Sequence, residues 1–211
     1  MRALLSSKWT KFAAFLSALA PLAVLSWRFY RRDLTANPLE FITHTTGDWT
    51  LRFLVLTLAI TPLRQLLRLP ELIRFRRMLG LFAFTYGCLH FATYLTLDKF
   101  FDFAEIWKDV AKRRFITVGF AAFLLMIPLA ITSTAGWIRR LGGRRWRALH
   151  RAVYASAICG VVHYYWLVKS DVRRPLVYGA LVALLLVWRA VAWSKERGKN
   201  RPLETAEDTA P

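Results

Sequence analysis

The hydrophobic residues of this chain fall into long blocks that are separated by short polar and basic segments. Six blocks approach the length of a transmembrane helix, which requires roughly 20 predominantly apolar residues. They cover residues 9–29, 49–67, 78–97, 115–138, 152–168 and 175–193. The pattern predicts an all-α integral membrane protein, with a bundle of six transmembrane helices over residues 9–193. Residues 1–8 are predicted to be a cytoplasmic N-terminus, and residues 194–211 a disordered cytoplasmic tail.

The composition and the distribution of charge indicate that the chain lies in a lipid bilayer. The chain is 56% hydrophobic, whereas a soluble domain is about 45–50% apolar. Its net charge of +18 does not indicate nucleic-acid binding, because the basic residues form short clusters between the apolar blocks instead of covering one soluble face. We therefore expect a multi-pass membrane protein with no nucleic-acid partner.

The basic clusters also orient the predicted bundle. With both termini in the cytoplasm, most Lys and Arg residues fall in the cytoplasmic segments 2–11, 64–77, 139–151 and 189–201. The positive-inside rule therefore predicts an N-in, C-in topology. No small-x-small cleavage site follows the first block, so we expect a retained helix and not a signal peptide. The amphipathic segment 101–114 is predicted to lie on the outer face, where it shields the bundle or docks a partner.

Histidines inside the apolar blocks are the candidate ligands of a cofactor. By helical rise, His90 lies about 18 Å and His163 about 16–17 Å from the cytoplasmic ends of their helices. Two histidines at similar depth could hold one haem between them, since neutral imidazole is a common axial ligand of haem iron. Histidines in membrane helices also serve as packing or proton-relay residues. His44 is expected in an outer loop, away from this pair.

The cytoplasmic end offers a second, less regular candidate site. His150 lies about 20 Å below His163 along the same helix and could ligate an inner haem. Thirteen residues leave these two side chains well off one helix face, so a local bulge would be needed. Arginines at the same depth could pair with haem propionates or attract an acidic donor protein. They are Arg76, Arg77, Arg144 and Arg145.

The two cysteines carry no comparable signal. Cys88 and Cys159 lie inside apolar blocks and form no Cys-x-x-Cys pair. Neither a zinc site nor a disulfide framework is therefore expected, and both residues are read as small packing side chains.

Four segments, in order along residues 40–190, resemble the MsrQ (YedZ) family of haem-binding membrane subunits. Through that family the chain is also similar to the ferric reductase-like transmembrane domain. The segments are Ile60-Thr61-Pro62-Leu63; Arg76-Arg77-Met78-Leu79-Gly80-Leu81 with Leu89-His90 and Tyr94; Pro128-Leu129-Ala130-Ile131-Thr132-Ser133; and Leu141-Gly142 with Trp146, Leu149-His150, Tyr154, His163-Tyr164, Trp166 and Lys169.

The resemblance implies a b-type cytochrome in a bacterial inner membrane. Its haem ligands fall on His90, His150 and His163, which implies one or two haems. Ferric reductases usually carry a second histidine where this chain has Arg76 and Arg77, so the inner haem lacks an evident second ligand. The expected acceptor is the periplasmic molybdopterin enzyme MsrP, which reduces methionine sulfoxide in oxidised proteins. The expected donor is the quinone pool or a cytosolic flavin reductase. FMN is expected from the resemblance alone, with no residues assigned to it.

Only 18 residues follow Trp193 in this sequence, with no Gly-rich loop for a nicotinamide or flavin domain. An electron-transfer subunit is therefore favoured over a self-sufficient reductase. Two alternatives stay open: a haem-free transporter or scaffold, in which the histidines pack or relay protons, and a stand-alone ferric reductase.

Overall fold

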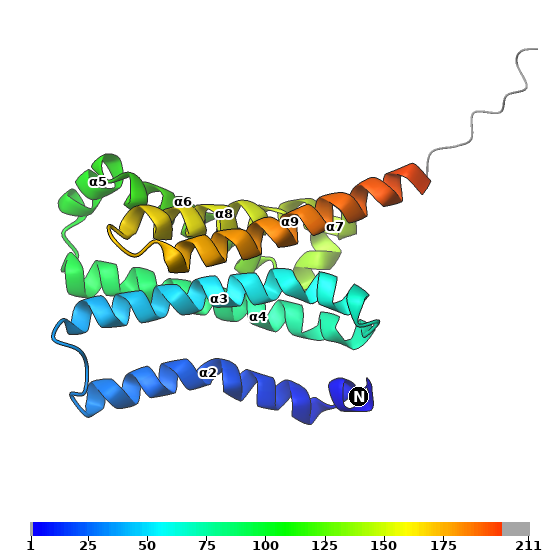
Figure 1. Ribbon diagram of the computed structural model, residues 1–211, viewed down its shortest axis with the longest axis horizontal. Helices are drawn as coiled ribbons and strands as arrows, with labels where there is room; N and C mark the ends of the chain where they lie inside the picture. The colour runs from blue at the N-terminus through cyan, green and yellow to red at the C-terminus, as the bar shows by residue number, and fades with distance from the viewer. Residues whose placement is uncertain (1, 200–211) are drawn as a thin grey trace, which may run out of the picture.

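The computed structural model describes residues 2–199, and these residues form helices with no β-strand among them. The all-α prediction is therefore confirmed. Two short helices, α1 (Arg2–Ser6) and the 3₁₀ turn η1 (Pro70–Leu72), accompany the long ones, and a π-helical segment, η2 (Tyr94–Asp98), extends α4. The remaining helices run roughly along one axis or cap its ends (Figure 1): α2 (Lys8–Tyr30), α3 (Pro38–Leu66), α4 (Ile73–Thr93), α5 (Phe103–Lys112), α6 (Arg114–Ile131), α7 (Ala135–Leu149), α8 (Ala152–Leu167) and α9 (Arg173–Lys199).

Four segments of the described chain are long and apolar enough to cross a membrane. They are Lys8–Tyr30, Pro70–Asp98, Arg114–Ile131 and Arg173–Lys195. α8 is apolar but has only 16 residues, and α3 has 29 residues with a more polar first part. The predicted count of six spans and the N-in, C-in orientation therefore stay predictions. The start of α2, the α3–α4 connection, α7 and the end of α9 lie at one end of the bundle, as that topology requires (Figure 1).

α3 begins eleven residues earlier than the predicted second block at 49–67. Asn37 caps its first turn, with the side-chain Oδ1 accepting a hydrogen bond from the Glu40 amide at 3.2 Å, and Pro38 occupies the first helical position. Both are ordinary helix-start signals. The prediction of an outer loop through His44 was therefore wrong, because His44 lies within α3.

The predicted helix 115–138 is broken at residues 132–134. The hydroxyls of Thr132 and Ser133 bond back to the carbonyls of Pro128 and Leu129 at 2.6 and 2.7 Å, and Thr134 caps the next helix at the Trp137 amide. That helix is α7, which kinks at Gly142, where φ is 71° and ψ is 152°. The basic segment predicted to link two spans is thus itself helical.

At the other end of the chain, α9 continues as a helix through Lys199, beyond the predicted end of the last span at residue 193. The rest of the predicted tail, residues 200–211, lies outside the described residues.

α2 is joined to the bundle at its middle. The buried core there contains Ala18, Phe53, Phe82 and Tyr86. The Tyr86 hydroxyl accepts a hydrogen bond from the Leu22 amide at 3.1 Å and donates one to the Ala18 carbonyl at 3.0 Å. These two groups flank Pro21, which has no amide proton of its own. Tyr86 therefore occupies the helix ladder at the proline and fixes α2 against α4.

Candidate functional site

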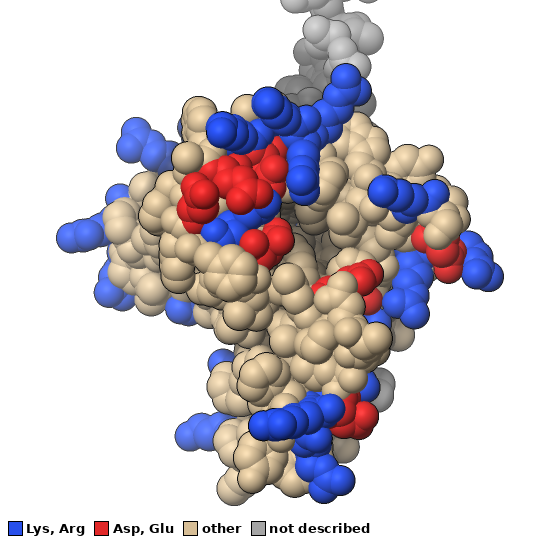
Figure 2. All heavy atoms as spheres, turned by 90° about the vertical axis from the view of Figure 1, so that its left-hand side faces the viewer, with Lys and Arg blue, Asp and Glu red and all other residues tan. Residues whose placement is uncertain are grey.

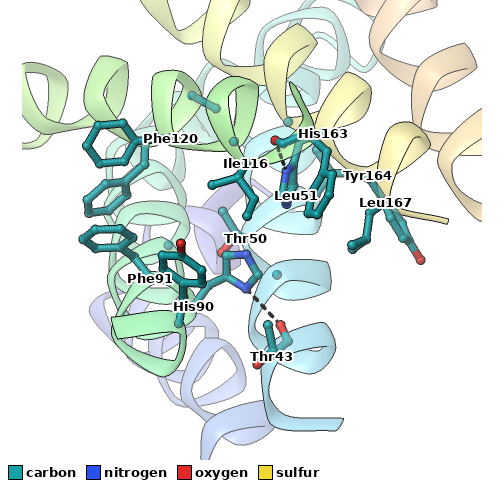
Figure 3. Close-up of a pocket in the computed structure, with 18 of the residues that line it drawn as sticks. Thr43, Thr50, Leu51, His90, Phe91, Ile116, Phe120, His163, Tyr164 and Leu167 are labelled. Atoms are coloured by element: carbon teal, nitrogen blue, oxygen red, sulfur yellow. Dashed lines mark hydrogen bonds between the residues drawn. The ribbon is translucent and has the colours of Figure 1, made fainter. Parts of the chain in front are cut away.

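A cavity of about 370 Å³ lies among α3, α4, α6 and α8, within the range of about 300–1,000 Å³ that small-molecule and cofactor sites occupy. One wall is aromatic: Phe91 stacks on Phe123 with ring centres 5.0 Å apart, and it lies 5.8 Å from Phe120. Two imidazoles, those of His90 and His163, line the same cavity (Figure 3). The site is thus an apolar chamber with two basic nitrogens among its few polar groups.

His90 is held by a backbone carbonyl of the neighbouring helix. Its Nδ1 lies 2.9 Å from the Thr43 carbonyl oxygen of α3. A carbonyl can only accept, so this contact fixes the proton on Nδ1 and leaves Nε2 with a free lone pair. A metal-binding histidine is commonly anchored in this way through its other ring nitrogen.

His163 repeats the arrangement on the opposite side of the cavity. Its Nδ1 lies 2.7 Å from the Phe115 carbonyl oxygen of α6, which again leaves Nε2 as the free nitrogen. The centres of the His90 and His163 rings are 6.1 Å apart. The depth argument from the sequence placed these two histidines at one level, and the structure brings their rings together across the bundle.

His90 and His163 would hold a metal-containing cofactor together. Each would offer its free Nε2, and the two ring centres lie only 6.1 Å apart. Both nitrogens that the carbonyls leave free are neutral imidazole donors, which suit haem iron. The residues present therefore fit one haem between His90 and His163.

Two glycines make room for the imidazoles. A Cβ atom on Gly119 would lie 2.5 Å from Nδ1 of His163, and one on Gly47 would lie 3.1 Å from Nδ1 of His90. Each glycine follows the anchoring carbonyl by four residues, so carbonyl and glycine share a helix face. A side chain at Gly119 would block the approach of the ring to the carbonyl, and one at Gly47 would crowd it.

His150 is placed elsewhere, at the end of α7. Its Nε2 lies 3.0 Å from the Thr132 hydroxyl, and its ring stacks on Trp146 with ring centres 3.9 Å apart. It does not line the cavity that holds His90 and His163. Because its Nε2 is engaged and one face of its ring is covered, the present arrangement does not fit an inner haem.

The four arginines predicted for propionate or donor contact are likewise separate from the cavity. Arg76 is half-buried, whereas Arg77, Arg144 and Arg145 are exposed. Arg144 and Arg145 follow the Gly142 kink in α7, and Arg77 lies on α4 beside α2. His44, in contrast, lines the cavity from α3.

The mouth of the cavity on the side of α5 carries an ionic network that the sequence did not reveal. Lys99, 6% exposed, pairs with Asp109 at 2.8 Å and with Glu105, and Arg113 pairs with Asp109 at 3.1 Å. Figure 2 shows acidic and basic side chains gathered beside a recess at this end of the molecule. Hydrogen bonds from Lys99 to the two carboxylates raise its pKa. Burial alone would raise the pKa of Asp109, but Lys99 and Arg113 together lower it. The network fixes α5 over the cavity, and Arg113 lines the mouth.

Comparison with known proteins identifies relatives of this chain. Residues 46–161 match the family described as ferric reductase like transmembrane component. Relatives named protein-methionine-sulfoxide reductase heme-binding subunit MsrQ include three bacterial proteins. The protein of Herminiimonas arsenicoxydans is 55% identical over 201 residues, covering 94% of this chain and 92% of the relative. That of Caulobacter vibrioides is 48% identical over 89% and 90%, and that of Rhodospirillum rubrum is 49% identical over 90% and 92%. These matches and the apolar helices fit a multi-pass protein of the bacterial inner membrane.

Proposed function

This chain belongs to the MsrQ family of haem-binding subunits, and we propose that it is an electron-transfer subunit that binds haem b between His90 and His163. One observation carries the proposal: two imidazoles line one cavity with ring centres 6.1 Å apart, and each is fixed through Nδ1 so that Nε2 is free. Packing histidines have no need of this shared orientation.

Each part of the chamber has a role in this proposal. When bound, haem supplies a one-electron iron couple inside the membrane. The Thr43 and Phe115 carbonyls fix the tautomer and the ring orientation of the two histidines. Phe91 and Phe123 keep water from the cavity, and a dry, apolar surrounding is one of the levers by which a protein sets a redox potential.

We further propose that the acceptor is MsrP, the molybdopterin partner in the methionine sulfoxide reductase system, on the periplasmic side. The donor is proposed to be the quinone pool or a cytosolic flavin reductase. Stopped-flow mixing of the reduced protein with MsrP and methionine sulfoxide tests the acceptor, which should reoxidise the protein. Binding of FMN rests on family resemblance alone, and flavin fluorescence of the denatured, purified protein tests it.

An inner haem on His150 stays a separate prediction. It would require His150 to leave Thr132, with propionates near Arg76, Arg77, Arg144 or Arg145. No electron-transfer step is assigned to it, because the present contacts of His150 do not fit that role. His150→Ala should lower the haem-to-protein ratio by one if an inner haem exists. An unchanged ratio would leave one haem and a structural histidine.

The central test is the spectrum of the purified protein. A reducible b-type spectrum is expected, and His90→Ala or His163→Ala should abolish its low-spin signal while the protein still accumulates in the membrane. Cys88→Ala and Cys159→Ala are matched controls, since each lies on the same helix as one histidine and neither lines the cavity. Full haem in both histidine variants would exclude this site.

The same preparation separates the alternatives. A haem-free transporter or scaffold would be colourless. A stand-alone ferric reductase would reduce iron chelates at a useful rate without MsrP. The close pair of imidazoles, each with a free Nε2, favours the haem subunit over a transporter, in which the histidines need only pack or relay protons.

A further inference from the structure

A second hollow lies between α2 and α4, at the end of the bundle where the N-terminus is found (Figure 1). It has a volume of about 710 Å³ and is separate from the histidine cavity. Its lining consists of four cations and four apolar side chains: Lys8, Lys11, Arg74 and Arg77, and Phe12, Phe15, Met78 and Leu81. The electron-transfer function uses none of the apolar four.

The lining is graded along the bundle axis. α2 and α4 run in the same direction, and on each helix the cations come first and the apolar residues follow. From Lys8 to Phe15, and likewise from Arg74 to Leu81, the rise along the helix is about 10 Å. The hollow is therefore basic at its end and apolar deeper in.

The cations of this groove lack counter-charges. None of the ion pairs within the described residues involves Lys8, Lys11, Arg74 or Arg77. Arg74 donates instead to the Leu5 carbonyl of α1 at 3.0 Å and to the Ser6 carbonyl, which closes the end of the groove without neutralising it. An anionic group at this end would meet four unpaired positive charges.

The groove is also open sideways, toward the surface that faces lipid. Phe12 is 53% exposed and Phe15 is 43% exposed, and α2 is buried only at Ala18 and Leu25. In a membrane, acyl chains cover such a surface. The occupant must therefore combine an anionic head with apolar chains.

We propose that this groove binds an anionic phospholipid, with its phosphate among Lys8, Lys11, Arg74 and Arg77 and its chains against Phe12, Phe15 and Leu81. Basic pockets between transmembrane helices on the cytoplasmic side are suited to anionic head groups. The bound lipid would join α2 to α4 beside the contact of Phe15 with Phe82, whose ring centres are 5.2 Å apart. The proposal does not rest on haem.

The test compares lipids on the purified full-length protein in detergent. Native mass spectrometry and the shift in melting temperature measure binding of dioleoyl phosphatidylglycerol and of dioleoyl phosphatidylcholine. The wild type should bind the anionic lipid more tightly. The double variant Lys11→Gln/Arg77→Gln should lose affinity for it about 25-fold, because each cation near an anionic head group contributes about fivefold. Its affinity for phosphatidylcholine should stay unchanged.

The control is Arg139→Gln/Arg140→Gln, which removes the same charge from exposed positions of α7 outside the groove. If the control loses as much affinity as the groove variant, the preference comes from general surface charge and the proposal is wrong. It is also wrong if inorganic phosphate in excess competes the lipid off, since the acyl chains would then contribute nothing. Should the double variant fail to accumulate, Lys11→Gln alone changes one exposed side chain and should still cost about fivefold; wild-type affinity in that variant refutes the site.

Discussion

Gly119→Ala tests the geometry of the haem site while both proposed ligands, His90 and His163, keep their identity. The added Cβ would lie 2.5 Å from Nδ1 and 2.8 Å from Cε1 of His163, whereas an ordinary contact is about 3.4 Å or more. The imidazole must therefore move by about 1 Å. Such a shift stretches the 2.7 Å bond to the Phe115 carbonyl and moves Nε2 relative to the His90 ring.

The expected loss follows from the role of that bond. Removing an outer-shell partner of a metal-binding histidine lowers metal affinity about 10- to 100-fold. Helix propensity alone acts in the opposite direction, because alanine stabilises a helix interior by about 1 kcal/mol relative to glycine. The variant should therefore accumulate normally but purify with little haem, and the remaining fraction should show an altered low-spin spectrum.

A graded series sharpens the test. Gly47→Ala brings a Cβ to 3.1 Å of the His90 ring and should cost less haem than Gly119→Ala. Gly80→Ala, whose Cβ would lie 3.6 Å from Cγ2 of Thr57, should cost none. Haem-to-protein ratios and reduced-minus-oxidised spectra measure the order. Full haem and a wild-type spectrum in Gly119→Ala would refute the reasoning.

Further predictions concern the ionic network, the attachment of α2 and the topology. Lys99→Met leaves Asp109 without its closest cation and should cost about 1–3 kcal/mol of stability, measured by thermal unfolding in detergent; a melting temperature equal to wild type would contradict it. Because the pKa of Asp109 is lowered and that of Lys99 is raised, the network should contribute fully between about pH 4 and pH 10, with the Asp109 part lost in stronger acid and the Lys99 part in stronger base. Tyr86→Phe removes the hydroxyl that bridges α2 at Pro21 and should lower the stability by about 1–2 kcal/mol. An unchanged melting temperature in the same assay would contradict this. Reporter fusions should show periplasm after Lys112 and Arg173 and cytoplasm after Arg74, Arg144 and Lys199, and a periplasmic C-terminus would overturn the six-span topology.

The sequence predicted the helical class and the level of the two histidines because both follow from helical periodicity and rise. It missed the start of α3, although Asn37 and Pro38 are helix-start signals, because the polar residues after them suggested a loop. It missed the break after Ile131, where the hydroxyls of Thr132 and Ser133 turn back onto the helix carbonyls. Threonine and serine also occur within helices, so only the packed structure decides whether such residues continue a helix or end it.

The anchors of the histidines could not be predicted, because they are backbone carbonyls. Any residue type supplies one, so Thr43 and Phe115 carry no sequence signal for this role. The ionic network of Lys99 and Asp109 was hidden for a different reason: its members are ten residues apart and meet only because α5 folds back over the cavity.

The two halves of the site nevertheless share one construction that links sequence to geometry. In the first half, His90 of α4 bonds to the Thr43 carbonyl of α3 and rests on Gly47. In the second, His163 of α8 bonds to the Phe115 carbonyl of α6 and rests on Gly119.

In both pairs the carbonyl and the glycine are four residues apart, hence on one face of one helix. Glycine in a helix interior costs stability, and here the lost side chain is what lets an imidazole reach the backbone. The signal for an anchored ligand is therefore a glycine in a neighbouring helix, four residues after the residue whose carbonyl bonds to the histidine. This signal can be recognised only once it is known which helices pack together. Two such pairs, α3 with α4 and α6 with α8, bring their histidines to one level, and a single cavity between them follows from that pairing.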